Sequence, residues 1–488
     1  MIFSILLYLV ICIYLANIFC VIATLYIERK QSMIAAVWIL IINFLPLIGF
    51  IVYLIFGRNI HLNNKITRIK KDFEALYNKY LIREKYLINS ENVVFTDKNT
   101  IKYIDIIKLN INANKSIYSQ DNDISIFTDG ADKYKSLIED LKNAKDTINI
   151  LYFIIRNDKI GEKIVDLLTE RAKAGVDVRI LYDQVGSILT PFNMFKKLIN
   201  AGGKVCKFFP ITLGHHISLN YRNHRKIVVI DGKIGYVGGM NIGDEYMNCG
   251  RRKLPWRDTH LRVTGSSVYF LQEIFLTDWY YASNERETHE KSFIKRLFPP
   301  MVSNDNGSIG VQVVSSGPDS NKEQIKRSFI KMISSAKKRI YIQTPYFIPD
   351  GPFLEALQTA AMCNIDVRIM IPEMPDKKFV YNATTSYIND LLDYGIKVYL
   401  YSGFLHAKMI LIDEDVCSLG TANIDIRSFA LDFEVNLFVY NRPFLLKCID
   451  IFEDDMKISK LVTKKQYDSR SIFTRISQAI SRLFSPLL

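Results

Sequence analysis

The sequence NHRKIVVIDG at residues 223–232 and the sequence LHAKMILID at residues 405–413 share one pattern that decides the fold. In each, a lysine follows a histidine by two positions, and an aspartate follows the lysine by five. With seven histidines in 488 residues, roughly a few hundredths of one such match are expected by chance. Two matches therefore indicate a duplicated functional motif. Its six members are His224, Lys226, Asp231, His406, Lys408 and Asp413.

Each motif lies on a run of apolar, mostly β-branched residues, which is typical of a buried strand. Side chains two positions apart share one face of a strand, so each histidine stands beside its lysine. This pair suits a phosphate group, because an imidazole can attack or move protons and an ammonium can neutralise phosphoryl oxygens. We therefore predict that the histidines and lysines are catalytic. The aspartates fall on the other face or in a turn, which favours a structural contribution to the catalytic motif.

A short turn of small residues follows each motif and ends in an asparagine. The turns read GGMN at residues 238–241 and GTAN at residues 420–423, and both asparagines lie 17 positions after their histidine. Small residues let the backbone approach an anion, and an amide can donate to a phosphate oxygen. The sequence therefore predicts that Asn241 and Asn423 bind the substrate phosphate.

Apolar strands and helical stretches alternate twice along the chain in the same order. Residues 148–155 and 340–348, for example, are apolar strands that open equivalent series. Alternation of strands and helices predicts the α/β class, and the repetition predicts two similar domains. We expect these domains at residues 120–290 and 305–460.

The N-terminus carries two uncharged runs, at residues 2–26 and 32–57, and each is long enough to cross a bilayer. A cleaved signal peptide is disfavoured, because the start is not basic and a second run follows at once. We predict a transmembrane hairpin of two helices at residues 1–57, the second of them bent near Pro46. A basic juxtamembrane linker at residues 58–119 follows.

Positive charge predicts both the orientation and the partners. The segment 58–71 carries five basic residues and the turn between the two runs carries two, so the positive-inside rule places the large C-terminal part in the cytoplasm. The net charge of +13 indicates anionic partners such as membrane lipid, a phosphorylated substrate or nucleic acid. The seven scattered cysteines are typical of reduced thiols, and we expect no metal and no cofactor.

These features resemble the phospholipase D superfamily, whose members carry two such motifs on paired α/β/α domains around one active site. Other stretches are similar to bacterial cardiolipin synthases: RNHRK at residues 222–226, GGMNIGDEY at 238–246, WRDTHLR at 256–262, QTPYF at 343–347 and GTANIDIRSF at 420–429. The resemblance covers nearly the whole chain. It implies two α/β/α sandwich domains in a pseudo-twofold arrangement, preceded by a hairpin in the bacterial plasma membrane.

The resemblance also implies a reaction without a metal. His224 attacks the phosphorus of one phosphatidylglycerol and glycerol leaves; a second phosphatidylglycerol then accepts the phosphatidyl group, which yields cardiolipin. His406 acts first as the acid and then as the base. The residues implied to hold the phosphoryl oxygens are Lys226, Lys408, Asn241 and Asn423. From the residues alone, either histidine could be the nucleophile.

A catalytic histidine needs a partner on its second ring nitrogen. Glu434, in a strand-like run, is our candidate for His406. Asp258 or His260, in a related run, is our candidate for His224.

At residues 470–488, apolar residues at helical spacing predict an amphipathic helix. Packing on the second domain and contact with the membrane are equally favoured. Three other functions compete with lipid transfer: a phospholipase that uses water, a nuclease and a non-enzymatic scaffold. The membrane hairpin disfavours a nuclease, so nucleic acid is not an expected partner, and two complete motifs disfavour a scaffold.

Overall fold

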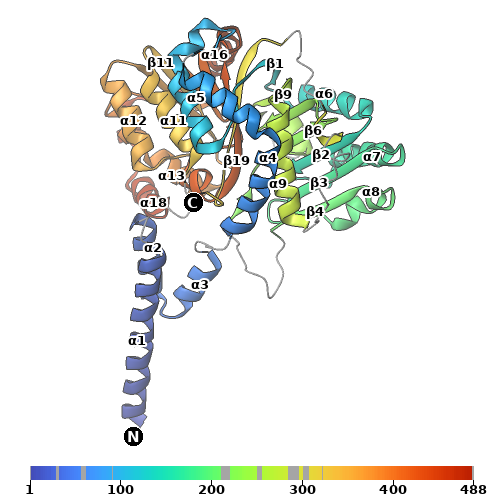
Figure 1. Ribbon diagram of the computed structural model, residues 1–488. Coiled ribbons are helices and arrows are strands. Elements are labelled where there is room, and N and C mark those ends of the chain that lie inside the picture. Colours follow the sequence, from blue (N-terminus) through green and yellow to red (C-terminus); the bar gives the residue numbers. More distant parts are fainter. Residues whose placement is uncertain are drawn as a thin grey trace.

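The computed structural model describes residues 2–28, 32–56, 62–90, 92–209, 220–249, 255–283, 296–299, 307–320 and 322–485. These residues form an α/β body from which one long N-terminal helix projects (Figure 1). A continuous mixed sheet runs through the body. The α/β class predicted from the sequence is confirmed.

The sheet consists of two halves with one strand order. From the centre outwards, the first half contains β1 (Ser119–Phe127), β9 (His260–Thr264), β7 (Ile234–Gly238), β6 (Ile227–Ile230), β2 (Thr147–Tyr152), β3 (Asp177–Asp183) and β4 (Lys204–Phe208). The second half contains β10 (Ile309–Ser316), β19 (Asp432–Tyr440), β17 (Val416–Gly420), β16 (Met409–Ile412), β11 (Arg339–Gln343), β13 (Asp366–Pro372) and β14 (Lys397–Tyr401), with β20 (Ser459–Leu461) at its edge. The halves join where β1 pairs with β10 in antiparallel orientation.

Two short pairings cross between the halves. β5 (Arg222–Asn223) leads into the first motif and pairs in parallel with the start of β19. β15 (Phe404–Leu405) leads into the second motif and pairs in parallel with β8 (Trp256–Arg257). The approach to each motif is therefore bound to a strand of the opposite half.

Both motif strands are buried on their two faces, which explains their uninterrupted apolar sequence. On β6, Ile227 and Val229 belong to the core shared by the two halves, whereas Val228 and Ile230 belong to a core of the first half. The residues of β16 alternate in the same way between the shared core and a core of the second half.

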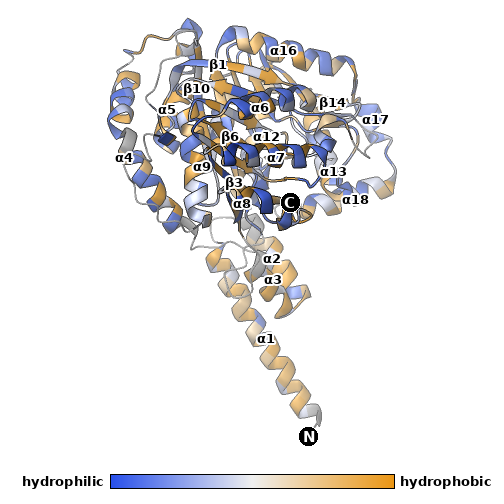
Figure 2. Ribbon diagram, turned by 90° about the vertical axis from the view of Figure 1, so that its right-hand side faces the viewer, coloured by the Kyte–Doolittle hydropathy of each residue, from blue (hydrophilic) through white to orange (hydrophobic). Residues whose placement is uncertain are grey.

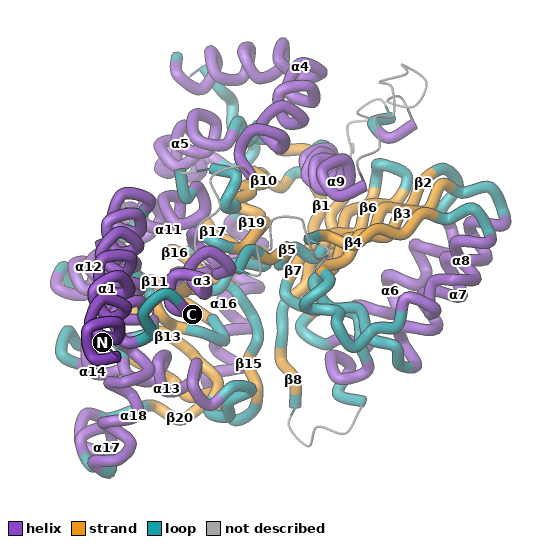
Figure 3. The backbone as a smooth tube through the Cα atoms, turned by 90° about the horizontal axis from the view of Figure 1, so that it is seen from below, coloured by secondary structure: helices purple, strands orange, loops and turns teal. Residues whose placement is uncertain are grey.

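Helices form these cores by covering both faces of the sheet. In the first half, α6 and α7 lie on one face and α9 lies on the other (Figure 3). In the second half, α11 and α12 lie opposite α16. The bounds are α6 (Gly130–Asn143), α7 (Lys159–Lys173), α9 (Val268–Ser283), α11 (Gln324–Ser335), α12 (Gly351–Met362) and α16 (Arg442–Lys457). Asp129, Asp158 and Asp350 begin α6, α7 and α12 by accepting a backbone N–H, as N-cap residues do.

Residues 58–119, predicted as a linker, instead contribute two long helices to the body. α4 (Leu62–Asn89) packs on α9, and α5 (Ile104–Asn114) packs on α11. Apolar residues seven or eight positions apart form one stripe along α4, which explains why this helix docks. The buried members of the stripe are Ile66, Phe73, Leu81 and Ile88. Lys70 adds an ion pair with Asp319 at 2.6 Å.

The first uncharged run forms α1 (Ile2–Ile27), an apolar helix that projects from the body (Figure 2). Its side chains are largely exposed. Within the part of the chain that the structure describes, α1 is the one helix long and apolar enough to cross a membrane. The second run forms α2 (Ser32–Phe44) and α3 (Ile48–Phe56), of 13 and 9 residues. Their lengths of about 20 Å and 14 Å are each below the roughly 30 Å of a hydrocarbon core.

The chain reverses direction between α2 and α3, so the second run is not the single bent helix that we predicted. Pro46 cannot donate to the helical ladder, and Leu47 adopts a left-handed conformation with φ of 64°. A Cβ atom on Gly49 would lie 2.7 Å from the Cα of Ile42, so only glycine allows the two helices to approach this closely.

Candidate active site

Backbone contacts across the two halves position both motif histidines. The N–H of His224 donates to the carbonyl oxygen of Phe433 at 3.0 Å, next to the β5 pairing. The N–H of His406 donates to the carbonyl oxygen of Arg257 at 2.7 Å, next to the β15 pairing. Each histidine is thus held by the main chain of the opposite half.

A buried carboxylate of the opposite half also orients each imidazole. Nδ1 of His224 lies 2.9 Å from Oε1 of Glu434. Nδ1 of His406 lies 2.7 Å from Oδ2 of Asp258. Both carboxylate side chains are fully buried. In these pairs Nδ1–H donates to the carboxylate, which leaves the lone pair on Nε2 for chemistry.

The pairing predicted from the sequence is therefore wrong. We expected Glu434 to hold His406, but it holds His224. We expected Asp258 or His260 to hold His224, but Asp258 holds His406. His260 is fully buried on β9, and neither of its ring nitrogens has a hydrogen-bond partner among the described residues, so it orients neither ring. The cause is the crossing of β5 and β15, which brings each histidine to the other half's carboxylate.

Burial makes both motif histidines neutral at neutral pH. Loss of solvation lowers the pKa of His224 to about 4, although the charge of Glu434 opposes the shift. Loss of solvation also lowers the pKa of His406 to about 4, although Asp258 opposes it. Burial alone would raise the pKa of each carboxyl, but the hydrogen bond from its histidine and the lysine charge beside it hold the pKa below its usual value. A neutral imidazole beside an ionised carboxylate is suited to nucleophilic attack, because the carboxylate stabilises the positive charge that then forms.

The motif lysines join the two histidines in one charge cluster. Nζ of Lys226 donates to the carbonyl oxygen of His224 at 2.6 Å, and Nζ of Lys408 donates to that of His406 at 2.5 Å. Burial lowers the pKa of Lys226 to about 7 and that of Lys408 to about 8. Each lysine also lowers the pKa of the histidine in the opposite motif, so the charges of the two motifs act on each other. An anion bound there would raise the pKa of both ammonium groups.

The residue 15 positions after each histidine differs between the two motifs, and in each motif it suits the carboxylate beside it. Thr421 donates its hydroxyl to Glu434, which also accepts from Ser428 Oγ at 3.0 Å. The equivalent Gly239 leaves room, since a Cβ there would lie 2.0 Å from Oδ1 of Asp258. Thr421 and Ser428 were not among the predicted site residues. Their signal in the sequence is the run of small polar residues after the second motif.

Arg225, between the histidine and lysine of the first motif, also supports Glu434. It is buried, and its Nη1 donates to both carboxylate oxygens of Asp278 at 2.7 Å. Its Nε donates to the carbonyl oxygen of Glu434 at 3.1 Å. The second motif has Ala407 at this position, so the two motifs differ in their surroundings.

The two predicted phosphate-binding asparagines differ in their present contacts. Oδ1 of Asn241 accepts from the N–H of Ile154, and its Nδ2 donates to the Tyr246 hydroxyl, both at 3.1 Å. Oδ1 of Asn423 is buried and has no hydrogen-bond partner among the described residues. Phosphate binding by these amides stays a prediction, and for Asn241 it requires an exchange of partners.

The motif aspartates lie at the far ends of the motif strands. The carboxylate of Asp231 accepts the backbone N–H groups of residues 145–147. The carboxylate of Asp413 accepts those of residues 337–339. Seven residues of extended chain, or about 20 Å, separate each aspartate from its histidine. Both aspartates therefore have a structural role. Each carboxylate joins the turn after its motif strand to the start of a neighbouring strand, β2 for Asp231 and β11 for Asp413.

Aromatic rings enclose the two imidazoles. The ring centroid of Phe153 lies 5.1 Å from that of His224, in an edge-on arrangement. The ring of Trp256 lies 5.3 Å from that of His406, and the ring of Phe404 lies 5.9 Å from it. These apolar walls explain why the imidazole pKa values fall.

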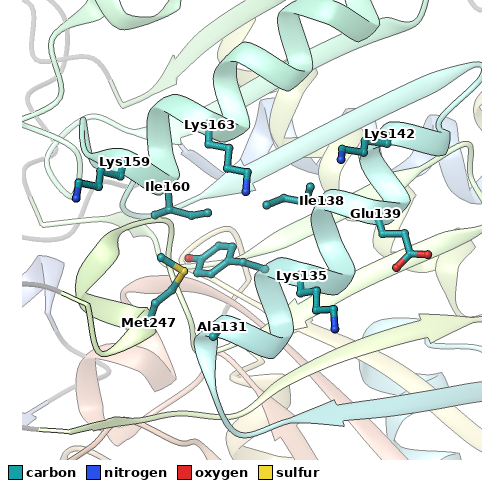
Figure 4. Close-up of a pocket in the computed structure, with 10 residues that line it drawn as sticks. Ala131, Lys135, Ile138, Glu139, Lys142, Lys159, Ile160, Lys163 and Met247 are labelled. Carbon is teal, nitrogen blue, oxygen red and sulfur yellow. The ribbon is translucent and has the colours of Figure 1, made fainter.

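A surface groove of about 550 Å³ lies between α6 and α7 (Figure 4). Lysines and apolar side chains line it, together with Glu139. The charged lining residues are Lys135, Glu139, Lys142, Lys159 and Lys163. No motif residue is among those that line this groove, so it is separate from the histidine cluster.

Comparisons with known proteins agree with the resemblance drawn from the motifs. A family model described as a cardiolipin synthase, phospholipase D-like domain matches residues 137–251 and 329–456. A model described as a phospholipase D-nuclease N-terminal region matches residues 15–58. The crystal structure of phosphatidylserine synthase from Haemophilus influenzae Rd KW20 has a TM-score of 0.59 at 16% identity, and the match covers 79% of this chain and 100% of that one. This last likeness is one of fold alone.

Relatives match along almost the whole chain. The major cardiolipin synthase ClsA of Bacillus subtilis (strain 168) is 44% identical over 480 residues, which cover 97% of this chain and 98% of that protein. A cardiolipin synthase of Listeria monocytogenes serotype 4a (strain HCC23) is 42% identical over 483 residues, which cover 99% of each chain. The chain therefore belongs to the cardiolipin synthase family of phospholipase D-like proteins.

Proposed function

We propose that the protein makes cardiolipin and glycerol from two molecules of phosphatidylglycerol through a phosphohistidine intermediate. The observation that carries the proposal is the crosswise pairing of each motif histidine with a carboxylate of the other half. It assembles two oriented imidazoles beside two ammonium groups, as a two-step transfer at one phosphorus requires. The names of the relatives support cardiolipin as the product.

In the first step, Nε2 of His224 attacks the phosphorus of one phosphatidylglycerol. The bond between phosphorus and the glycerol oxygen breaks, and His406 gives its proton to that oxygen, so that free glycerol leaves. The negative phosphodiester and Asp258 together offset the cost of burying a protonated His406. Assignment of His224 as the nucleophile follows from the family resemblance.

In the second step, the free glycerol hydroxyl of another phosphatidylglycerol gives its proton to His406. Its oxygen attacks phosphorus, the bond between His224 and phosphorus breaks, and cardiolipin forms. Both histidines return to their starting protonation states. The groups proposed to hold the non-bridging oxygens in both steps are Lys226, Lys408, Asn241 and Asn423.

In this proposal the two motifs form one shared active site and not two separate ones. The two halves are related by a pseudo-twofold axis at the junction of β1 and β10. The repeated strand order and the two reciprocal crossing strands support this relation.

The reaction can be tested with purified protein and phosphatidylglycerol in detergent, with the lipid products identified by mass. We expect cardiolipin and glycerol in equal amounts, also in the presence of EDTA, because two lysines neutralise the phosphate. Added glycerol should drive cardiolipin back to phosphatidylglycerol, since the exchanged bonds are similar in energy. If phosphatidic acid were the dominant product at every glycerol concentration, the protein would be a hydrolase and not a transferase.

The apolar helix α1 and the family indicate a membrane protein. In our proposal α1 crosses the bilayer, the α2–α3 hairpin enters and leaves on one side, and the body lies in the cytoplasm. The basic residues Arg29 and Lys30 and those of residues 58–71 are then expected on that same side, while residues 2–27 carry no charge. This arrangement satisfies the positive-inside rule with one span in place of the two that we predicted.

Thiol labelling in intact cells distinguishes these topologies. We expect a membrane-impermeant reagent to label a cysteine introduced at Ser4, near the start of α1. A cysteine at the exposed Ser90 should react only after the cells are opened. Labelling of Ser90→Cys in intact cells would show that the body lies outside the cytoplasm. Protection of both sites would instead support the two-span hairpin.

A further inference from the structure

The C-terminal helix α18 (Ile472–Leu483) packs its polar face against the body. Gln478 and Ser481 are only 6% and 1% exposed. Nε2 of Gln478 donates to Oγ1 of Thr385 at 2.8 Å. Thr385 lies on α13 (Lys378–Ser386), the helix against which α18 packs.

Further polar contacts hold α18 in this orientation. Nδ2 of Asn382 donates to Oγ of Ser477 at 2.7 Å. Arg482 forms an ion pair with Asp390 at 2.5 Å. The docked face of α18 is therefore fixed by side-chain hydrogen bonds and not by apolar burial.

The apolar face of α18 points away from the body. Its five large apolar side chains are 51% to 81% exposed. They are Ile472, Phe473, Ile476, Ile480 and Leu483. An amphipathic helix of a water-soluble domain turns its apolar face towards the core, and α18 does the opposite. Such a contiguous exposed apolar surface marks an interaction site.

The position of α18 indicates what covers this face. Figures 1 and 2 place α18 at the edge of the body from which α1 projects. The exposed Phe379 of α13 lies beside Phe484, with ring centroids 6.3 Å apart, and extends the apolar surface at this edge. The apolar surface of α1 and that of α18 therefore belong to one end of the molecule.

The charge around α18 fits an anionic surface. Residues 464–482 carry five basic side chains and one acidic side chain; Lys464 and Arg482 pair with Asp393 and Asp390 of the body, which leaves Lys465, Arg470 and Arg475. Basic residues beside an apolar helix face are typical of helices that lie in the interface of an anionic membrane.

We propose that the apolar face of α18 lies in the surface of an anionic lipid bilayer, in the leaflet next to the body. This inference rests on the membrane location proposed above. It adds a second membrane contact, far from α1 in the sequence, and the two contacts together fix how the body is turned relative to the bilayer.

An environment-sensitive dye on the full-length protein tests this proposal. The dye is attached to Phe473→Cys or, as the matched control, to Leu446→Cys on α16, which lies at the opposite end of the body in Figures 1 and 2. The exposed native cysteines Cys12, Cys249 and Cys363 are replaced by serine. The protein is reconstituted in vesicles of phosphatidylglycerol and phosphatidylcholine.

We expect lipid-borne spin labels to quench the dye at position 473 several-fold more than the dye at position 446, and aqueous iodide to do the reverse. Equal access of iodide to both dyes would overturn the proposal. Protection from iodide without quenching by lipid, increasing with protein density, would also overturn it and would indicate a second copy of the chain as the partner.

Turnover separates this inference from the proposed reaction. Phe473→Asp should lower cardiolipin formation on vesicles several-fold but leave formation in detergent micelles unchanged, whereas Leu446→Asp should change neither. Equal rates for both variants on vesicles would overturn a functional contact. Absence of cardiolipin in micelles for the unaltered protein would contradict the proposed reaction, while the quenching result would still decide the place of α18.

Discussion

Replacement of either motif histidine by alanine should lower cardiolipin formation by about ten-thousand-fold or more. His224→Ala removes the proposed nucleophile, and His406→Ala removes the group proposed to move protons in both steps. Because the proposed reaction uses both rings at one phosphorus, we expect that neither motif can work alone. His289→Ala, outside both motifs, is the control and should keep full turnover.

A substrate with a better leaving group separates the two roles. A phosphatidyl ester of p-nitrophenol releases its alcohol without needing a proton, so its first step depends on the nucleophile alone. We expect His406→Ala to give a burst of p-nitrophenolate and a phosphatidyl adduct on His224, detected by mass after denaturation at neutral pH. His224→Ala should give neither. An adduct on His406 would exchange the roles, and full turnover by either variant would contradict a shared site.

Asp258→Asn and Glu434→Gln should each lower kcat by about a hundred- to ten-thousand-fold with natural substrate. An amide keeps the shape of the carboxylate but cannot stabilise the positive imidazole that forms in each step. The crosswise pairs make the two variants different with the p-nitrophenyl ester. Glu434→Gln should lose the burst, because Glu434 holds the nucleophile, whereas Asp258→Asn should keep it. The opposite result would show that His406 is the nucleophile and would exchange the roles of the two histidines.

Gly239→Ala provides a check that does not change any charge. An added methyl at this position would meet Oδ1 of Asp258 at 2.0 Å, so the carboxylate must move from His406. We expect this variant to behave as Asp258→Asn does. The control is Gly351→Ala, where a Cβ has no atom within 4 Å and full turnover is expected.

The sequence was sufficient to predict the repeat and the motif residues, because these depend on local spacing. His224 and Lys226 must be two apart to share a strand face, and such a spacing is visible without a structure. The partner of each histidine was not predictable in this way. It depends on β5 and β8, strands of two residues that show no periodicity, and on contacts between positions 148 and 210 residues apart.

In the N-terminal region, too, a local property could be predicted from the sequence but the path of the chain could not. The apolar composition of residues 32–57 indicated a membrane segment, but hydropathy alone does not distinguish one long helix from two short ones. The reversal depends on Pro46, Leu47 and Gly49 together, and only the close approach of Gly49 to Ile42 shows that the chain turns back.

The reciprocal crossing strands β5 and β15 make the orientation of both imidazoles an all-or-none property of the assembled body. If the two halves moved apart, both imidazoles would lose their carboxylate partners at once. The electrostatics of the site therefore oppose any hinge opening at the seam. In the proposed reaction, lipids therefore enter and leave while the two halves stay together, and a substitution at either carboxylate acts on a histidine 148 or 210 positions away in the sequence.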